Sequence, residues 1–347
     1  MLDDLKYIHQ RDGQDALGIA EKQWRQYTHK FNIDWSDGGW LPKAVMVAGM
    51  GGSALAATAL SAVPGLDVAF EVVRDYDLPK HVDNSYLLIC SSYSGNTEET
   101  LSIANKALSL PESKRPRIVC ISSGGKLQKI AKEQGFPLVN LPGGYQPRFT
   151  FGYQYSAVAQ LFEKAGLVKG LVGQVEQGAE IVKKVVESWR PDVSSKENLA
   201  KQIALELAGK SAVIYSGPKM FPAAYKWKIS LNETAKNVAW CNQYPEFNHN
   251  EFMGWTSHPI QKPYGVVELR SQYDHPQIQK RFEISDRLLS GRRPAPIIVN
   301  IPKGVSQLED LMWAVALGDF VSIYLALANG VNPTPVDLIE KLKAELK

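Results

Sequence analysis

The feature that most constrains the fold is a series of short apolar runs that alternate with helical segments. Five runs lie in the first half of the chain and three in the second, each bounded by turn residues. Runs that are apolar on both faces and separated by helices are typical of a parallel sheet with helices on both sides. The sequence therefore predicts an α/β fold with doubly wound parallel sheets. The predicted strands are residues 44–49, 68–73, 86–92, 117–123, 137–142, 211–217, 264–270 and 295–302.

A break in this alternation predicts two domains. Residues 166–209 are charged and helical, with Pro191 between two helical pieces, and the strand pattern restarts after them. A chain of 347 residues, 44% of them apolar, is long enough to fill two ordinary cores. We expect an N-terminal helical segment with a helix at 13–29, a first domain, a helical connection, a second domain and a C-terminal helix. These cover residues 1–37, 38–165, 166–209, 210–330 and 331–347 respectively.

The composition argues against several classes of partner. The 39 basic and 36 acidic residues are interspersed and give a net charge of +3, so we expect neither nucleic acid nor membrane binding. Cys90, Cys120 and Cys241 form no CxxC pair, which fits a reducing compartment without structural zinc. The N-terminus is too charged for a secretory signal, and we expect no apolar stretch to reach the ~20 residues of a membrane span. A soluble cytoplasmic protein is predicted.

A glycine-rich turn follows the first predicted strand and opens a helix. The backbone of this turn, GMGGSA at 49–54, suits an anion. Gly49, Gly51 and Ala54 match the dinucleotide fingerprint, and Glu71 lies near the position of an acidic ribose ligand. Glu71 is also explained as a polar residue of a strand, so an NAD(P)-dependent oxidoreductase stays an alternative. A Walker nucleotide loop is excluded because the chain has no GxxxxGK[ST] motif.

A second loop of the same kind, SSYSGNTEET at 91–100, follows the third predicted strand. Ser92, Ser94 and Thr97 place three hydroxyls ahead of a helix whose first N–H groups are free and whose dipole end is positive. The alternative is that Ser94 or Thr97 only caps the helix. Open parallel sheets bind ligands at the carboxyl ends of neighbouring strands. We therefore expect the two loops to bind one compact phosphate dianion.

Taken in order, the motifs resemble a known family. GMGGS followed by SYSGNTEET resembles the sugar isomerase (SIS) domain, which binds phosphosugars. The likeness continues in QPR at 146–148, NETAKN at 232–237, EFNHNEFMGW at 246–255 and LGDFVSIYLALANGVNPTPVDLIEKLK at 317–343. The series resembles the bifunctional phosphoglucose/phosphomannose isomerases of archaea and bacteria, which contain two SIS domains. This implies an aldose-ketose isomerase for glucose 6-phosphate and fructose 6-phosphate, and for mannose 6-phosphate, acting by proton transfer through an enediolate.

The resemblance also implies roles for five residues. Glu233 is the base that moves the proton between C1 and C2, and Arg148 stabilises the enediolate as a permanently charged donor. His249 opens the sugar ring with help from Lys341, while Thr334 accommodates either epimer at C2. Each residue also has an ordinary interpretation. Glu233 and Lys341 can be solvated helix residues, Arg148 can form a surface salt bridge, and His249 can bond its own loop.

The phosphate contacts implied by the family come from the two loops: Gly51, Gly52, Ser53, Ser92, Ser94 and Thr97. We expect no cofactor and no metal, because proton transfer needs none and the acidic and histidine residues show no ligand spacing. The family commonly has Asp before PTP, where this chain has Asn332. We expect Asn332 to shape the turn.

Two further expectations concern alternatives and assembly. A non-catalytic phosphosugar sensor on the same fold is the runner-up, although a sensor has no need of Glu233, Arg148 and His249 together. The family implies a homodimer with shared active sites, Glu233 coming from one chain and His249 from the other. The segment 241–255 supports this because it is dense in aromatic residues, which suit a two-fold interface. The alternative is that this loop folds back over its own domain.

Overall fold

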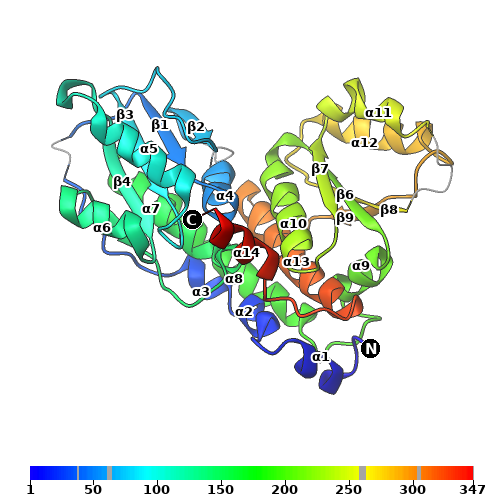
Figure 1. The fold of residues 1–347 in the computed structure, drawn as a ribbon. Coiled ribbons are helices and arrows are strands. Elements are labelled where there is room, and N and C mark those ends of the chain that lie inside the picture. Colours follow the sequence, from blue (N-terminus) through cyan, green and yellow to red (C-terminus); the bar gives the residue numbers. More distant parts are fainter. Residues whose placement is uncertain (37–38, 61–64, 258–262, 303–305, 347) are drawn as a thin grey trace. The chain divides into compact units, whose positions relative to one another are not determined.

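The computed structural model describes residues 1–36, 39–60, 65–257, 263–302 and 306–346 (Figure 1). The chain divides into two compact units. We call Gln23–Glu180 the amino-terminal unit, and Met1–Lys22 together with Ile181–Lys347 the carboxy-terminal unit. Each unit contains one parallel sheet, which confirms the predicted fold class.

The amino-terminal unit holds a five-stranded sheet in the order β2-β1-β3-β4-β5. Its strands are β1 Ala44–Ala48, β2 Ala69–Val73, β3 Tyr86–Ser91, β4 Arg117–Ser122 and β5 Leu138–Asn140. Its helices are α3 Trp24–Tyr27, α4 Gly51–Leu60, α5 Glu98–Ser109, α6 Gly125–Gln134 and α7 Phe151–Lys164, and η2 is a short 3-10 turn at Pro147–Phe149. The chain moves in opposite directions along the sheet after β1 and after β3. Right-handed crossovers therefore put α4 and α5 on opposite faces.

The carboxy-terminal unit holds a four-stranded sheet in the order β7-β6-β8-β9, which matches the order of β2-β1-β3-β4. Its strands are β6 Ser211–Ser216, β7 Ala239–Gln243, β8 Tyr264–Arg270 and β9 Ile297–Asn300. The helices that build it are α1 Leu5–Arg11, α2 Ala16–Glu21, α9 Leu199–Leu207, α10 Phe221–Glu233, α11 Glu251–Gly254, α12 Pro276–Leu288, α13 Gln307–Ala328 and α14 Asp337–Glu345.

Helix α10 is fixed to α13 by buried groups from both helices. The Trp227 indole donates to the carbonyl of Ala314 at 2.7 Å. Lys226 forms an ion pair with Asp319, which also accepts a bond from Ser230 at 3.1 Å. These contacts fix the carboxyl end of α10, where Glu233 is the last helical residue.

Helix α13 corrects the expectation that no segment is long and apolar enough to span a membrane. It has 22 residues, and by length and composition it passes that test. Its apolar window is 94% buried inside the protein, where α9, α10 and α2 pack on it. Burial on all sides explains why the helix is apolar all round, as expected of a core helix.

All eight predicted strands are present, but one strand was missed. Strand β7 pairs in parallel with β6 and begins the segment 241–255 that was expected to be a loop. Its sequence, AWCNQ, is polar at its end and Trp240 is exposed, because β7 is an edge strand. The predicted helix 13–29 is also divided, into α2 and α3.

The structure divides the chain at other places than the predicted domain boundaries. The first 22 residues belong with the carboxy-terminal unit, and the division falls within helix α8, Leu171–Val185. Helix α9, expected in a connection, packs against α13 instead. Its buried residues Ile203, Ala204 and Leu207 form one apolar face, which explains why it joins that core.

Candidate active site

The serine-rich loop after β3 is held by its own hydroxyls. The Ser92 side chain is buried, accepts a bond from the backbone N–H of Gly95 at 3.1 Å, and lies 2.7 Å from the Thr97 hydroxyl. Gly95 has φ +68°, and a Cβ there would lie 1.8 Å from the carbonyl oxygen of Gly124. Only glycine fits this turn, so the loop conformation follows directly from the sequence SGN.

The helix-cap alternative does not explain Ser94 and Thr97. Thr97 is the residue before α5, yet its side chain makes no capping bond. The hydroxyl of Ser94 is exposed, and its one hydrogen bond within the described part of the chain is from the N–H of Asn96 at 3.2 Å. Both hydroxyls, together with the N-terminus of α5, are available to an anion.

The glycine-rich loop after β1 lies against the serine-rich loop. The backbone N–H of Tyr93 donates to the Ser53 hydroxyl at 3.1 Å, and Ser53 is only 7% exposed. Gly51 and Gly52 begin α4, so their N–H groups belong to the unpaired first turn of a helix. The structure thus brings together all six predicted phosphate residues within the amino-terminal unit.

Arg148 lies on a turn that packs against the same glycines. A Cβ on Gly52 would lie 3.1 Å from the carbonyl oxygen of Pro147, so this approach depends on glycine. The Arg148 side chain is 1% exposed, and its guanidinium lies 4.5 Å from the centre of the Phe149 ring. The interpretation as a surface salt bridge is therefore wrong. Gln26 fixes the turn by donating to the carbonyl of Phe149 at 2.8 Å.

Glu233 and Thr334 belong to the carboxy-terminal unit, where their segments lie side by side. Lys236 links them, because its ammonium donates to the carbonyls of Thr234, Asn332 and Pro333 at 3.2, 2.8 and 3.3 Å. Glu233 is half-buried. The side chain of Asn332 accepts the N–H of Thr334 at 2.9 Å, so it shapes the turn as expected.

His249 ends a 3-10 turn, η5 Glu246–His249, that follows β7. Its imidazole is exposed and makes no hydrogen bond to any residue that the structure describes, so the alternative of a histidine bonded to its own loop is not supported. Lys341 lies in α14 and is also exposed. The sequence-predicted residues thus form two groups: the phosphate loops with Arg148 in one unit, and Glu233, Thr334, His249 and Lys341 in the other.

The density of aromatic residues around His249 predicted a dimer interface, and the structure does not support that prediction. Tyr244 and Phe247 are fully buried and Trp255 is 6% exposed, all in the core of their own unit. The Tyr244 ring contacts Phe282 of α12 at 4.3 Å between ring centres. The segment therefore folds back over its own sheet, as the alternative proposed, and its aromatic content no longer supports an interface.

Glu71, the possible ribose ligand, lies on the edge strand β2. Its carboxylate is 3.2 Å from the His81 imidazole. Among the described residues, no three histidine, cysteine, aspartate or glutamate side chains come together to hold a metal ion.

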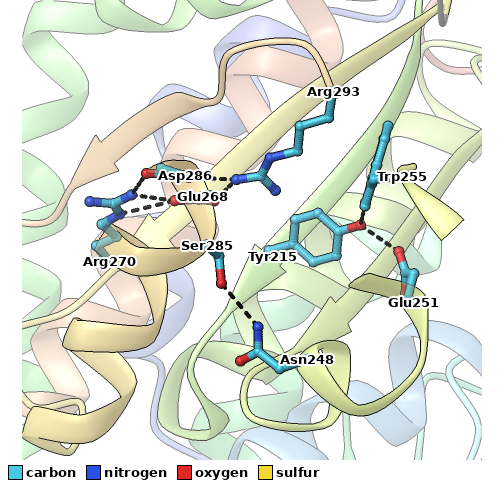
Figure 2. A network of polar contacts seen from close by, with 9 residues as sticks. All are labelled: Tyr215, Asn248, Glu251, Trp255, Glu268, Arg270, Ser285, Asp286 and Arg293. Atoms are coloured by element: carbon cyan, nitrogen blue, oxygen red, sulfur yellow. Dashed lines mark hydrogen bonds and ion pairs between the residues drawn. The ribbon is translucent and has the colours of Figure 1, made fainter. Parts of the chain in front are cut away.

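Several polar residues of the carboxy-terminal unit were not singled out from the sequence. They are Tyr215, Glu251, Glu268, Asp274, Arg293 and Asp310. All but Asp274, which accepts from the nearby N–H of Ser271, pair across elements far apart in the chain. Figure 2 shows most of them in a network around α12. The only local signal was a charged or polar residue inside an apolar run, such as Glu268 in YGVVELR.

Two parallel-sheet α/β units, with a glycine-rich and a serine-rich loop meeting at the strand ends of the amino-terminal unit, are the arrangement expected of the SIS-domain sugar phosphate isomerases. The family described as the bacterial phospho-glucose isomerase C-terminal SIS domain matches residues 196–346, from α9 to α14. The chain belongs to the family of bifunctional phosphoglucose/phosphomannose isomerases.

Individual relatives show how far this likeness extends. The bifunctional phosphoglucose/phosphomannose isomerase of Caldicellulosiruptor bescii is 35% identical, over 87% of this chain and 89% of the relative. That of Aquifex aeolicus is 34% identical, over 88% and 91%. A solved structure, a glucose-6-phosphate isomerase like protein from Thermus thermophilus, has a TM-score of 0.66 at 18% identity and covers 98% of both chains. The last likeness shows the shared fold alone.

Proposed function

We propose that this protein is an aldose-ketose isomerase that interconverts glucose 6-phosphate, fructose 6-phosphate and mannose 6-phosphate. The observation that carries the proposal is the meeting of two strand-end loops and Arg148 in the amino-terminal unit. The hydroxyls of Ser94 and Thr97, beside two helix N-termini, suit one phosphate dianion. Family membership supports the reaction, and this geometry supports the substrate class.

The proposed chemistry assigns one task to each remaining residue. Glu233 moves the proton between C1 and C2, and its half-buried position limits its hydration. Arg148 stabilises the negative charge of the enediolate, since a guanidinium stays charged and donates without losing its proton. His249, with Lys341, opens the sugar ring, and Thr334 accommodates both epimers.

We also propose a cytoplasmic homodimer with shared active sites and with neither nucleic acid nor membrane partners. Balanced charge and three free cysteines support the location and the absence of those partners. Sharing of the site between chains is supported by the family resemblance alone, because the aromatic residues near His249 are already covered within their own unit.

A coupled assay with each hexose 6-phosphate tests the function, and Glu233→Gln tests the mechanism. The amide keeps the size of the side chain but cannot accept the proton, so turnover should fall at least ~10²-fold. Binding of the phosphosugar should persist. Glu283→Gln, an exposed change on α12, is the matched control and should behave as the parent.

Two outcomes would contradict the proposal at different levels. Binding of phosphosugars by the parent protein without turnover of any of them would favour the sensor. Turnover of Glu233→Gln within a few-fold of the parent would remove Glu233 from the role of base and leave the reaction class unaffected.

A further inference from the structure

The short segment that carries His249 is attached on both sides to the interior of its own unit. Asn248 precedes the histidine and Glu251 follows it by two residues. Both side chains make hydrogen bonds to other elements, as Figure 2 shows. The imidazole itself makes no hydrogen bond to a described residue, so its position is set by these neighbouring attachments.

Asn248 is attached to helix α12. Its side-chain amide donates to the Ser285 hydroxyl at 2.9 Å, and its oxygen accepts from the Arg281 guanidinium at 3.0 Å. One N–H and one oxygen lone pair of this amide are therefore used within the unit, which leaves one of each.

Helix α12 is in turn fixed to the sheet by buried charges. Glu268 of β8 is fully buried and accepts from Arg293 at 2.6 Å and from the Nε of Arg270 at 3.0 Å (Figure 2). Both arginines also pair with Asp286 of α12. Each acid contacts both bases, so a shift of α12 along the sheet would separate the partly buried Asp286 from both arginines, of which Arg293 is buried.

Glu251 is attached to the inner strand β6. The hydroxyl of Tyr215 donates to one carboxylate oxygen of Glu251, and the side-chain amide of Asn242 donates to the other at 2.6 Å. The Trp255 indole donates to the same Tyr215 hydroxyl at 2.9 Å. Burial, and then the charge of Glu251, raise the pKa of Tyr215, so the hydroxyl keeps its proton and stays a donor.

Tyr215 therefore has one donor and one acceptor bond in fixed directions. Its ring is fully buried on an inner strand of the sheet and packs on Phe247 at 4.5 Å between ring centres. A phenylalanine would fill the same space, so packing alone does not require the hydroxyl. The hydroxyl serves to hold Glu251, and with it the residues next to His249.

We propose that Tyr215 and Glu251 are positioning residues that hold His249 in the orientation needed to act on the sugar ring. This rests on the role of His249 in the proposed function. A group that transfers protons must lie within hydrogen-bond reach of its target, and small misplacements cost large factors in rate. Because all three residues belong to one chain, the inference holds whether His249 acts in its own subunit or in its partner.

The test compares Tyr215→Phe with the parent protein under the hexose 6-phosphate assay. We expect kcat to fall on the order of 10-fold, while KM changes less than about 2-fold, because the phosphate contacts lie in the other unit. Glu251→Gln, which can still accept the Tyr215 bond, should retain most of the activity that Glu251→Ala loses. The control is Tyr155→Phe, since the buried Tyr155 hydroxyl has no partner among the described residues.

Introducing Tyr215→Phe into the His249→Ala variant separates a positioning effect from general structural damage. If Tyr215 acts through His249, Tyr215→Phe should lower kcat in the parent but leave the residual activity of His249→Ala unchanged. Hydrogen exchange of a peptide covering residues 244–255 should also become faster in Tyr215→Phe, whereas peptides of β8 should keep their rates.

The outcomes distinguish the inference from the function on which it rests. Unchanged kcat in Tyr215→Phe, with His249→Ala impaired, would overturn the inference and leave the proposed function standing. An equal loss in both backgrounds would also overturn it, because the effect would then bypass His249. Parental activity of His249→Ala would instead remove the proposed role of the histidine.

Discussion

We predict that Asp310 makes the free energy of unfolding depend on pH. It lies in α13, is fully buried, and accepts a bond from the Ser271 hydroxyl at 2.5 Å, while its other oxygen has no partner among the described residues. Asp274 is 4% exposed and is joined to the same serine through the backbone N–H of Ser271 at 3.4 Å. Burial first, then the charges of Asp274 and Glu309, raise the pKa of Asp310 to about 6.

The direction of this pH dependence follows from the pKa of Asp310 in the folded and in the unfolded chain. The ordinary pKa is 3.8 and the folded value is about 6, so the folded protein binds the proton more tightly. The carboxyl therefore costs nothing below pH 4, destabilises progressively as the pH rises from 4 to 6, and has its full cost above that range. Two pKa units correspond to about 3 kcal/mol. Burial raises the pKa of Asp274 to about 6 as well, so the two groups titrate together and we expect about 2–3 kcal/mol from this change.

Asp310→Asn removes the charge and keeps an acceptor for Ser271. The new amide N–H groups find no partner where the free oxygen was, which costs about 1–3 kcal/mol at every pH. The free energy of unfolding of the variant, relative to the parent, should therefore rise by about 2 kcal/mol between pH 4.5 and pH 8, because about 1 kcal/mol of the cost is already present at pH 4.5.

Urea unfolding at several pH values measures this difference. Trp313 lies in the same helix and is 5% exposed, so its fluorescence reports on this core. Asp337→Asn, an exposed change at the start of α14, is the control and should show no such trend. A relative stability that is constant with pH, or that falls as the pH rises, would refute the reasoning.

Three further predictions concern the loops and the assembly. Thr97→Val and Ser94→Ala should each weaken substrate binding by about 1–3 kcal/mol, with inorganic phosphate competing in the parent; unchanged affinity in both would leave these hydroxyls without a phosphate role. Gly95→Ala should destabilise the amino-terminal unit more than Gly135→Ala, because both glycines have φ +68° but only the first has no room for a Cβ; equal losses in urea unfolding would contradict this. Co-refolding Glu233→Gln chains with His249→Ala chains should restore roughly a quarter of the parental activity if the sites are shared, whereas no recovery from verified mixed dimers would assign both residues to one chain's site.

The sequence alone determined the parallel sheets and the phosphate loops because their signals are local. An apolar run between turn residues becomes a buried strand whatever its partners along the chain are. A glycine or hydroxyl that follows the run then lies at the carboxyl end of that strand. The turn at Gly95 illustrates this, since the N–H of Gly95 bonds the Ser92 hydroxyl of the same loop, although the lack of room for a Cβ comes from Gly124 of a later loop.

Tertiary structure decided what depends on partners far along the chain. The aromatic residues of 244–255 predicted an interface, yet they are buried because Phe282 of α12 and Tyr215 of β6 pack on them. The same holds for the attachment of Glu251 to Tyr215 and for the raised pKa of Asp310, which arises from burial inside its own unit and from Asp274. Packing, burial and charge coupling act through distances of a few ångströms in space, and a linear pattern does not specify which residues the fold brings that close.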